Sequence, residues 1–96
     1  MAEYRVTPRA QRDLEDIFDY TAKQWGLPQA IRYTNIIEAT FASLAETPQQ
    51  SQNCDAIRQG YRRRAVERHV VYFRQTDYGI AIVRILHQRM DQVRHL

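Results

Sequence analysis

Apolar residues recur at intervals of three and four positions over two stretches of the N-terminal half, and this spacing predicts two amphipathic helices. Thr7 and Pro8 favour an N-cap and a first helical position for the first helix, and Gly26 is placed to end it as a left-handed C-cap residue. The predicted apolar stripe of this helix consists of Ala10, Leu14, Ile17, Phe18, Thr21 and Trp25.

The second helix is predicted to begin at Leu27-Pro28 and to end before Thr47-Pro48. Its inward face is expected to carry Ala30, Thr34, Ile37, Phe41, Leu44 and Ala45. Three further residues widen its apolar surface, which fits either a broad core face or a partner groove: Tyr33, Ile36 and Thr40. Because the connection between the helices is short, residues 8 to 47 are expected to form an antiparallel helical hairpin.

The second half of the chain changes to β-rich runs. The predicted strands are Tyr61 to Val66, His69 to Arg74 and Ile80 to His87. Thr76-Asp77-Tyr78-Gly79 indicates a hairpin turn between the last two, and Tyr4-Arg5-Val6-Thr7 indicates a short strand at the start of the chain. Residues 49 to 56 are predicted to form a polar loop, and residues 88 to 96 either a last helical turn or a disordered end.

The predicted fold is α+β, with an N-terminal strand and an antiparallel helical hairpin packed on a mainly antiparallel four-stranded sheet, within a single domain of residues 1 to 96. Phe18 and Trp25 are expected to be buried against Phe41 and the sheet. Residues 80 to 86 are apolar on both alternating faces, so the face turned away from the helices is expected to need separate cover. That second face is a candidate partner site.

Basic residues gather in the C-terminal part of the chain. Residues 1 to 57 hold five Lys or Arg against eight Asp or Glu, whereas residues 58 to 96 hold nine against three, which gives charges of −3 and +6. Thirteen of the fourteen basic residues are Arg, a side chain suited to paired contacts with carboxylates or phosphates. The composition therefore indicates an acidic partner, either another protein or a nucleic acid.

Several classes of protein are disfavoured by what the sequence contains. Cys54 is the only cysteine, so an intramolecular disulfide is excluded and the residue is expected to be a free thiol in a loop. No apolar run approaches the roughly 18 residues of a membrane span, and no secretory segment is recognisable, so the protein is expected to be cytoplasmic. Because no phosphate-binding glycine loop, metal-ligand spacing or nucleophile-base pair is present, we predict no cofactor, no metal and no catalytic residue.

The ordered set of segments resembles the ParE branch of the RelE/ParE toxin superfamily, and the resemblance covers nearly the whole chain. It is carried by Tyr4-Arg5-Val6-Thr7-Pro8-Arg9-Ala10 with Asp13-Leu14 and Ile17, by Tyr20, Trp25-Gly26 and Gln29-Ala30, by His69-Val70-Val71-Tyr72-Phe73-Arg74, and by Ile82-Val83-Arg84-Ile85-Leu86-His87-Gln88-Arg89-Met90-Asp91 with His95-Leu96. The chain departs from the usual pattern in the loop after Pro48, where relatives often carry a glycine, and in its concentration of arginine at Arg62-Arg63-Arg64.

The resemblance implies the toxin of a type II toxin-antitoxin system, which inhibits DNA gyrase by binding rather than by catalysis and is neutralised by a ParD-like antitoxin. We expect an apolar helix or extended segment of a small acidic antitoxin to cover the exposed side of the sheet. The residues predicted to bind the antitoxin are Tyr33, Ile36, Arg62, Arg64, Arg74, Ile82 and Arg84. The residues predicted to contact gyrase are Arg68, His87, Arg89, Met90 and Arg94. No direct sequence-specific nucleic-acid binding by the toxin alone is expected.

Two alternatives remain open at this point: a RelE-like ribosome-dependent mRNA endonuclease, and a relative that binds an antitoxin without acting on gyrase. An endonuclease needs a base, an acid and cationic stabilisation of the phosphorane, which His69, His87, Arg68, Arg84 and Arg89 could supply. RelE-like nucleases typically use lysine-rich or glutamate-containing strands and a tyrosine near the C-terminus. In this chain Lys23 is the only lysine and no tyrosine follows Tyr78, which weighs against that activity.

Overall fold

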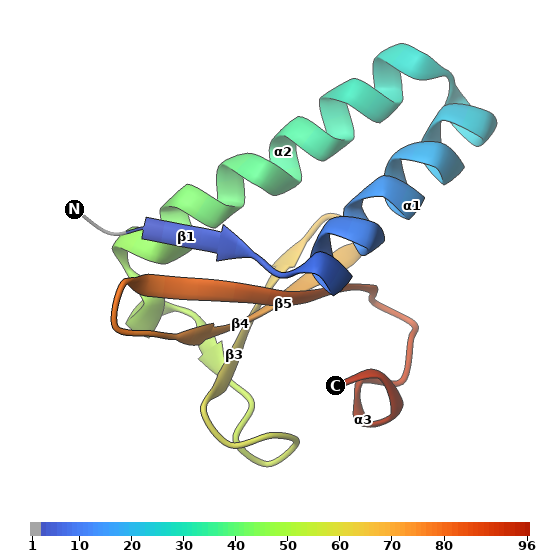
Figure 1. Cartoon of the computed structure of the whole chain (residues 1–96). Coiled ribbons are helices and arrows are strands. Elements are labelled where there is room, and N and C mark those ends of the chain that lie inside the picture. The colour runs from blue at the N-terminus through green and yellow to red at the C-terminus, as the bar shows by residue number, and fades with distance from the viewer. Residues whose placement is uncertain (1–2) are drawn as a thin grey trace.

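The computed structural model describes residues 3–96 and places two long helices on one face of a twisted sheet (Figure 1). In chain order the elements are β1 (Glu3–Val6), α1 (Pro8–Trp25), α2 (Leu27–Glu46), the 3-10 turn η1 (Pro48–Gln50), β2 (Gln52–Asn53), β3 (Tyr61–Val66), β4 (His69–Gln75), β5 (Gly79–His87) and α3 (Gln92–His95). The sheet has the strand order β1-β5-β4-β3-β2. The pairing of β1 with β5 is parallel and the other pairings are antiparallel, which confirms the predicted α+β class.

The start of α1 and the junction between the helices follow the local sequence signals. The Thr7 side chain accepts a hydrogen bond from the Ala10 N–H at 3.2 Å, with Pro8 at the start of the helix. Gly26 ends α1 and begins α2, with a φ of 96° and a ψ of 163°. The positive φ explains the glycine, but the ψ is extended, so the predicted left-handed helical cap is wrong in that detail.

The hydrophobic core lies between the helical hairpin and the sheet. All six residues predicted for the inward face of α2 are buried. In α1, Ala10, Leu14, Ile17 and Thr21 are buried as predicted, and Asp13 joins them on the same face. The side chains that complete the cluster come mainly from the strands: Val66, Val71, Phe73, Ile80, Ile82 and Ile85.

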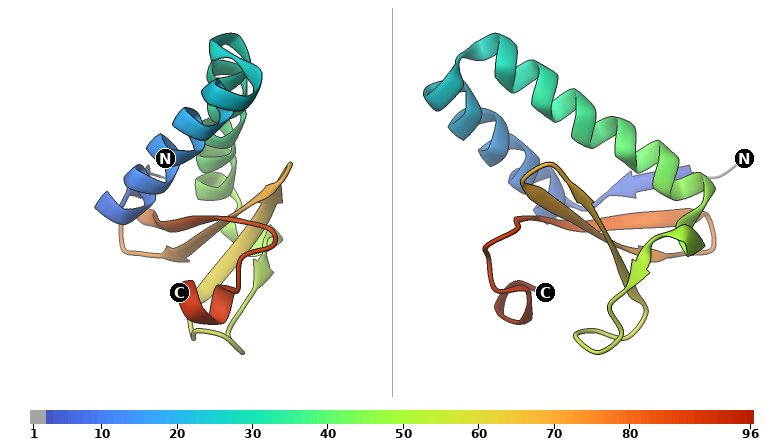
Figure 2. Two further views of the ribbon diagram at one scale, coloured as in Figure 1. Left: turned by 90° about the vertical axis from the view of Figure 1, so that its right-hand side faces the viewer. Right: turned by 180° about the vertical axis from the view of Figure 1, so that it is seen from behind.

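The predicted burial of Phe18 and Trp25 is wrong. Trp25 is 65% exposed, and Phe18 is only partly buried and lies outside the core cluster. The tip of the hairpin extends past the end of the sheet, as both views in Figure 2 show, so the last turns of α1 have no strand beneath them. Helical periodicity indicates which face of a helix is apolar, but it does not indicate how far the sheet reaches under that face.

The face of the sheet turned away from the helices is covered by the chain itself. Tyr72 and Leu86 are buried there together with Cys54, and the cover is supplied by side chains of the 54–61 loop and by Leu96. Ile82 lies on the opposite side, in the main core, with an exposed fraction of 0%. The expectation that this face is open for a partner is therefore wrong, because the C-terminal segment folds back over it.

Residues 49 to 56 are more ordered than the predicted polar loop. Arg62 holds this segment by donating hydrogen bonds to the carbonyl oxygens of Pro48, Gln49 and Ser51 at 2.9, 3.1 and 2.6 Å. The anchored segment pairs with β3 through Gln52 and Asn53, which adds a short fifth strand to the predicted four. Among the helices described in residues 3–96, none combines the length and apolar character needed to cross a membrane.

Candidate binding groove

A groove of about 740 Å³ runs between the helical hairpin and the sheet end that carries the β3–β4 turn. Its lining comes from α1, α2, that turn, and the adjoining ends of β4 and β5. The lining residues are Asp16, Ile17, Tyr20, Thr21, Trp25, Gln29, Arg32, Tyr33, Ile36, Glu67, Arg68, His69 and His87.

The walls of the groove are apolar and exposed. Tyr20 and Trp25, both from α1, are 66% and 65% exposed although both are large aromatic residues. Tyr33 and Ile36 face them from α2 and pack at their inner ends against the core. Aromatic side chains that remain exposed beside a groove are typical of surfaces that bind another protein.

The floor of the groove is polar, and Tyr33 organises it. The Tyr33 hydroxyl lies 2.6 Å from His69 Nδ1 and accepts a hydrogen bond from the Arg68 backbone N–H at 3.2 Å. Burial raises the pKa of Tyr33, so this hydroxyl keeps its proton at neutral pH. The turn that it holds includes Glu67 in a left-handed conformation with a φ of 55°. A single side chain of α2 therefore fixes the position of the β3–β4 turn.

His69 and His87 are register partners on β4 and β5, and their ring centroids lie 5.3 Å apart. Burial, and to a lesser extent the neighbouring His87, lowers the pKa of His69 to about 4. His69 is therefore neutral near pH 7. The Nδ1 atom of His87 accepts a hydrogen bond from the Arg89 backbone N–H at 3.1 Å, which leaves the ring proton on Nε2 when the ring is neutral.

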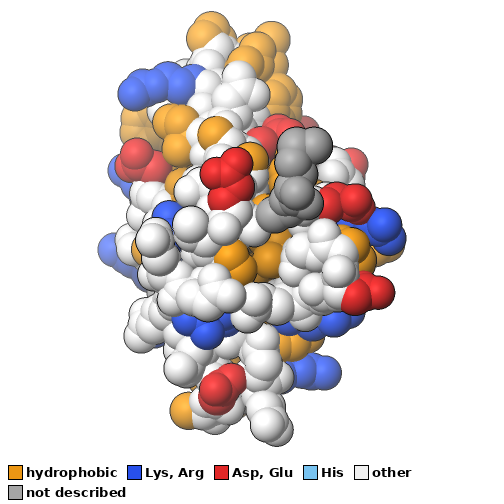
Figure 3. Space-filling view, turned by 90° about the vertical axis from the view of Figure 1, so that its left-hand side faces the viewer, with side chains coloured by type: hydrophobic (Ala, Val, Ile, Leu, Met, Phe, Trp, Pro, Cys, Tyr) orange, Lys and Arg blue, Asp and Glu red, His pale blue; other side chains and the backbone are white. Residues whose placement is uncertain are grey.

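The charges that line the groove are mixed. Arg32 and Arg68 are matched by Asp16 and Glu67. Basic and acidic side chains are also interspersed on the face drawn in Figure 3, which looks onto the side of the molecule where β1 begins rather than into the groove. A polyanion is best bound by a continuous basic surface, so this distribution favours a protein partner over a nucleic-acid backbone.

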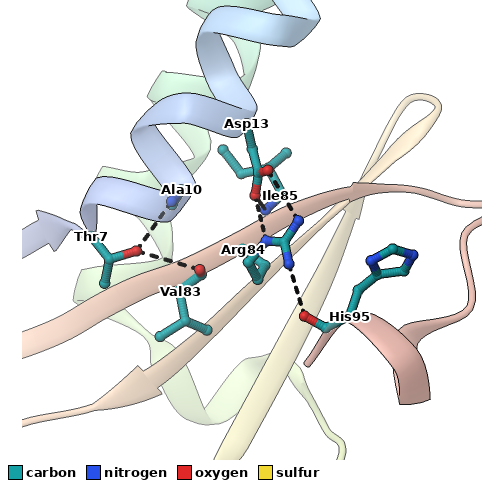
Figure 4. Close-up of polar contacts among 7 residues, drawn as sticks. All are labelled: Thr7, Ala10, Asp13, Val83, Arg84, Ile85 and His95. Carbon is teal, nitrogen blue, oxygen red and sulfur yellow. Dashed lines mark hydrogen bonds and ion pairs between the residues drawn. The ribbon is translucent and has the colours of Figure 1, made fainter.

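A second polar network joins α1, β5 and α3 near this end of the sheet (Figure 4). The Asp13 carboxylate accepts hydrogen bonds from Arg84 Nε at 2.8 Å, Arg84 Nη2 at 3.1 Å and the Ile85 N–H at 3.0 Å. The remaining terminal nitrogen of Arg84, Nη1, donates to the His95 carbonyl oxygen at 2.8 Å. This arrangement satisfies a buried carboxylate and a nearly buried guanidinium together.

The position of this network follows from where β1 ends. β1 pairs with β5 only as far as Val6 and Ile82, and the first turn of α1 then lies beside the next residues of β5. Thr7 Oγ1 donates to the Val83 carbonyl oxygen at 3.3 Å, and Asp13 accepts the Ile85 N–H (Figure 4). Side chains of α1 and of its N-cap residue therefore satisfy backbone groups of β5 that β1 no longer reaches.

The C-terminal segment is fastened to the sheet by its polar groups as well as by Leu96. Gln92 Oε1 accepts hydrogen bonds from Arg63 Nη1 at 2.8 Å and from the Tyr72 hydroxyl at 2.7 Å. Arg58 Nη1 donates to the Leu96 carbonyl oxygen at 3.0 Å. The segment is thus an integral cover of the sheet.

The residues predicted to bind the antitoxin do not form one surface. Tyr33 and Ile36 line the groove, but Ile82 is in the core, and the guanidinium groups of Arg62 and Arg84 bind the chain itself. Arg64 and Arg74 lie on β3 and β4, and the alternation of side chains places them on opposite faces of the sheet. The prediction that Ile82 binds the antitoxin is wrong, because its fully buried side chain offers no contact surface.

The residues predicted to contact gyrase divide into two neighbouring groups. Arg68 and His87 line the groove, next to Tyr33. Arg89 and Met90 follow β5 and are exposed, and Met90 lines a smaller adjoining hollow of about 210 Å³ together with His69 and His87. Arg94 is exposed on α3.

Sequence reasoning missed several residues of the groove and of the network. The sequence pattern gives Tyr20 a place only in the resemblance, predicts Trp25 in the core and gives Arg32 no role, yet all three line the groove. Asp13 enters the sequence prediction only as part of the resemblance, and its buried ion pair is not predicted, although a carboxylate on an apolar helical stripe signals a buried partner. The matching signal is Arg84, the only charged residue in the apolar run of β5.

Within residues 3–96, no group of three or more His, Cys, Asp or Glu side chains is placed to hold a metal ion. Cys54 is a free, buried thiol whose pKa is raised by burial, which disfavours the reactive thiolate.

The fold and the groove define a small α+β protein with an exposed, aromatic-walled binding surface, and this fold has a solved counterpart. A structure described as the chromosomal ParDE TA system from P. aeruginosa matches with a TM-score of 0.80, over 91% of this chain and 96% of that chain, at 24% sequence identity. The model of the family described as the ParE toxin of type II toxin-antitoxin system, parDE, matches residues 4–92.

Curated relatives agree over the full length. The chain is 41% identical over 96 residues to Toxin ParE1 of Caulobacter vibrioides, which covers 100% of this chain and 99% of the relative. It is 40% identical over 96 residues to Toxin ParE1 of Mycobacterium tuberculosis, with 99% and 98% covered, and 31% identical over 97 residues to Toxin ParE of Escherichia coli, with 100% and 94% covered. The chain belongs to the ParE toxin family of type II toxin-antitoxin systems.

Proposed function

We propose that this toxin acts in the cytoplasm by binding DNA gyrase, and that a ParD-like antitoxin neutralises it by occupying the groove. The observation that carries the proposal is the groove itself, in which Tyr20 and Trp25 stay exposed above a polar floor. Large exposed aromatic side chains around fixed polar groups are the usual composition of an energetic centre in a protein interface. The ParDE description of the family model supports an antitoxin as the partner.

The antitoxin segment lies along the hairpin and places apolar side chains against Tyr20, Trp25 and Ile36. Its carboxylates pair with Arg32 and Arg68, which line the same groove. An amphipathic helix in a groove or an extended segment would meet these requirements.

Neutralisation follows from overlap. Arg68 and His87, which we assign to the gyrase surface, share the groove with Tyr33 and Ile36, which we assign to the antitoxin. An antitoxin that fills the groove therefore covers part of the surface that gyrase needs. The remaining proposed gyrase contacts are Arg89, Met90 and Arg94.

The arrangement of the histidines favours binding over ribonuclease chemistry. A general base needs an accessible nitrogen with a free lone pair. In His87 the Nδ1 lone pair accepts the Arg89 N–H, and in His69 the Nδ1 atom faces the Tyr33 hydroxyl at 2.6 Å. Both basic nitrogens are thus engaged within the chain.

The test compares two activities of the purified toxin. We expect it to inhibit gyrase-dependent supercoiling, to be relieved by its ParD-like antitoxin, and to leave mRNA intact on translating ribosomes. The variants His87→Gln and Arg89→Ala are expected to weaken gyrase inhibition in a graded way, by about 1–3 kcal/mol of affinity each. Ribosome-dependent cleavage that a single histidine change abolishes, with gyrase unaffected, would overturn the proposal.

A further inference from the structure

His87 is held in one tautomer by the backbone beyond β5. The Arg89 N–H donates to His87 Nδ1 at 3.1 Å, so that nitrogen carries the lone pair. The proton of the neutral ring is therefore on Nε2. In this state His87 presents an N–H donor, not an acceptor, on its outer edge.

His69 is held in the same tautomer by Tyr33. The Tyr33 hydroxyl accepts the Arg68 N–H, and its own proton has two acceptors within reach: His69 Nδ1 at 2.6 Å and the Val66 carbonyl oxygen at 3.5 Å. The shorter contact is of normal length for such a bond and the longer one is not, so the proton points to His69 Nδ1. The proton of the His69 ring is then on Nε2 as well.

Both Nε2–H groups reach the surface. Neither forms a hydrogen bond within the described residues, and every fully buried side-chain nitrogen or oxygen of residues 3–96 has a partner. The two Nε2 atoms are therefore accessible. Both rings line the groove and the smaller hollow beside it, and their centroids are 5.3 Å apart.

We propose that His69 and His87 form a seat for one carboxylate at the sheet end of the groove, and that an aspartate or glutamate side chain of the antitoxin occupies it. A carboxylate has two acceptor oxygens and no donor, which suits two N–H donors carried by rings whose centroids lie 5.3 Å apart. The inference rests on the proposed function and adds the chemistry of the contact.

The surrounding charges select a single carboxylate over a phosphate chain. Arg68 and Arg32 from the groove and Arg9 from the adjoining hollow attract an anion, whereas Asp16, Glu67 and the Arg84-paired Asp13 line the same two spaces. One carboxylate between two N–H donors is compatible with that balance. A run of phosphates would extend along spaces that these three acidic side chains line, and like charges repel.

The first test uses sodium acetate as the probe and the full-length toxin separated from its antitoxin. Imidazole nitrogen resonances are followed by NMR, with sodium chloride at matched ionic strength as the control. We expect saturable shifts of Nε2 in His69 and His87, and none in His95, which lies on α3 outside the groove. Equal response of all three histidines to acetate and chloride would rule out the seat. If inorganic phosphate binds more tightly than acetate and an RNA oligonucleotide displaces it, the carboxylate proposal is overturned in favour of a nucleic-acid ligand.

The second test measures antitoxin affinity in three variants. His87→Leu removes the donor and is expected to weaken binding about 10- to 100-fold. His87→Gln keeps an N–H donor near the position of Nε2 and is expected to lose less than about threefold, and His95→Gln is the matched control with no loss. Equal affinity of wild type and His87→Leu would reject the seat and leave the proposed function standing. No antitoxin binding by the wild type would reject both.

Discussion

Asp13 and Arg84 lie 71 positions apart in the chain, yet Arg84 Nε is 2.8 Å from Asp13 Oδ2 and both side chains are nearly enclosed. Asp13→Ala would leave Arg84 as a buried charge without its carboxylate partner, and the Ile85 N–H without a hydrogen-bond acceptor. We expect this variant to lower the free energy of unfolding by about 3–5 kcal/mol, measured by urea denaturation.

The matched control is the ion pair between Glu3 and Arg5, at 2.6 Å with both side chains largely exposed. Because water screens that pair, Glu3→Ala is expected to leave stability essentially unchanged. Similar stability losses for Asp13→Ala and Glu3→Ala would show that the buried network does not hold α1 on β5.

Trp25 lines the groove and Phe41 lies in the core, so truncating them is expected to have different effects. Phe41 is 1% exposed, so Phe41→Ala is expected to cost about 3–5 kcal/mol of stability. Trp25→Ala is expected to change stability by less than about 0.5 kcal/mol, but to weaken antitoxin binding about tenfold or more. Denaturation curves and titration calorimetry of both variants check this pair. Strong destabilisation by Trp25→Ala would show that Trp25 packs in the core and would contradict its place in the groove.

Stability is expected to fall in mild acid because of His69. Burial and His87 lower the pKa of His69 from 6.5 to about 4, so between these values the unfolded chain binds a proton that the folded chain excludes. The free energy of unfolding therefore decreases as pH is lowered through this window and is unaffected by His69 above it.

Urea midpoints at about pH 7.5, 6 and 5 measure this dependence. His69→Gln removes the titrating group and is expected to show a shallower decline, whereas His95→Gln is expected to keep the wild-type slope. An identical slope in all three proteins would assign the acid sensitivity to other groups.

Arg94→Ala is a sharper probe of the gyrase surface than deletion of residues 90–96. The deletion would also remove Gln92, the His95 carbonyl and Leu96, which fasten the cover of the sheet. The deletion is expected to lower the midpoint of thermal unfolding. A loss of gyrase inhibition could then come from unfolding as well as from a lost contact with gyrase. Arg94→Ala is expected to weaken gyrase inhibition by about 1–3 kcal/mol of affinity at an unchanged midpoint. Unaltered inhibition would exclude Arg94 from the gyrase surface.

Local sequence signals were sufficient for most of the fold. Thr7-Pro8 and Gly26 delimit α1, and the apolar spacing of α2 matches its buried face residue by residue. These features depend on the chemistry of neighbouring residues, which a single sequence displays directly.

The candidate site was harder to predict because it depends on how far elements extend past one another. Trp25 has the spacing of a core residue and becomes a groove wall only because the sheet stops short of the hairpin tip. The apolar pattern of β5 suggests that Ile82 and Leu86 could both face a partner. In the structure Ile82 is buried in the main core, and Leu86 is buried in the cluster that Leu96 covers. The pairing of His69 with His87 depends on strand register, which side-chain patterns alone do not fix.

The parallel pairing of β1 with β5 sets the order in which the protein can be completed during translation. Residues 3–6 are synthesised well before their partners, residues 79–82, so the first strand stays unpaired until β5 has emerged from the ribosome. Gly79 makes the junction possible, because a Cβ there would lie 1.9 Å from the Glu3 carbonyl oxygen.

The groove is subject to the same delay, since His69 and His87 lie on β4 and β5, which are synthesised after the helical hairpin. A growing chain therefore has the hairpin walls of the groove but no floor. Under the proposed function, the antitoxin therefore finds its complete site on the toxin only after β5 has been released. Chains that terminate before β5 have neither a partner for β1 nor a complete groove, so under the proposed function we expect them to be non-toxic.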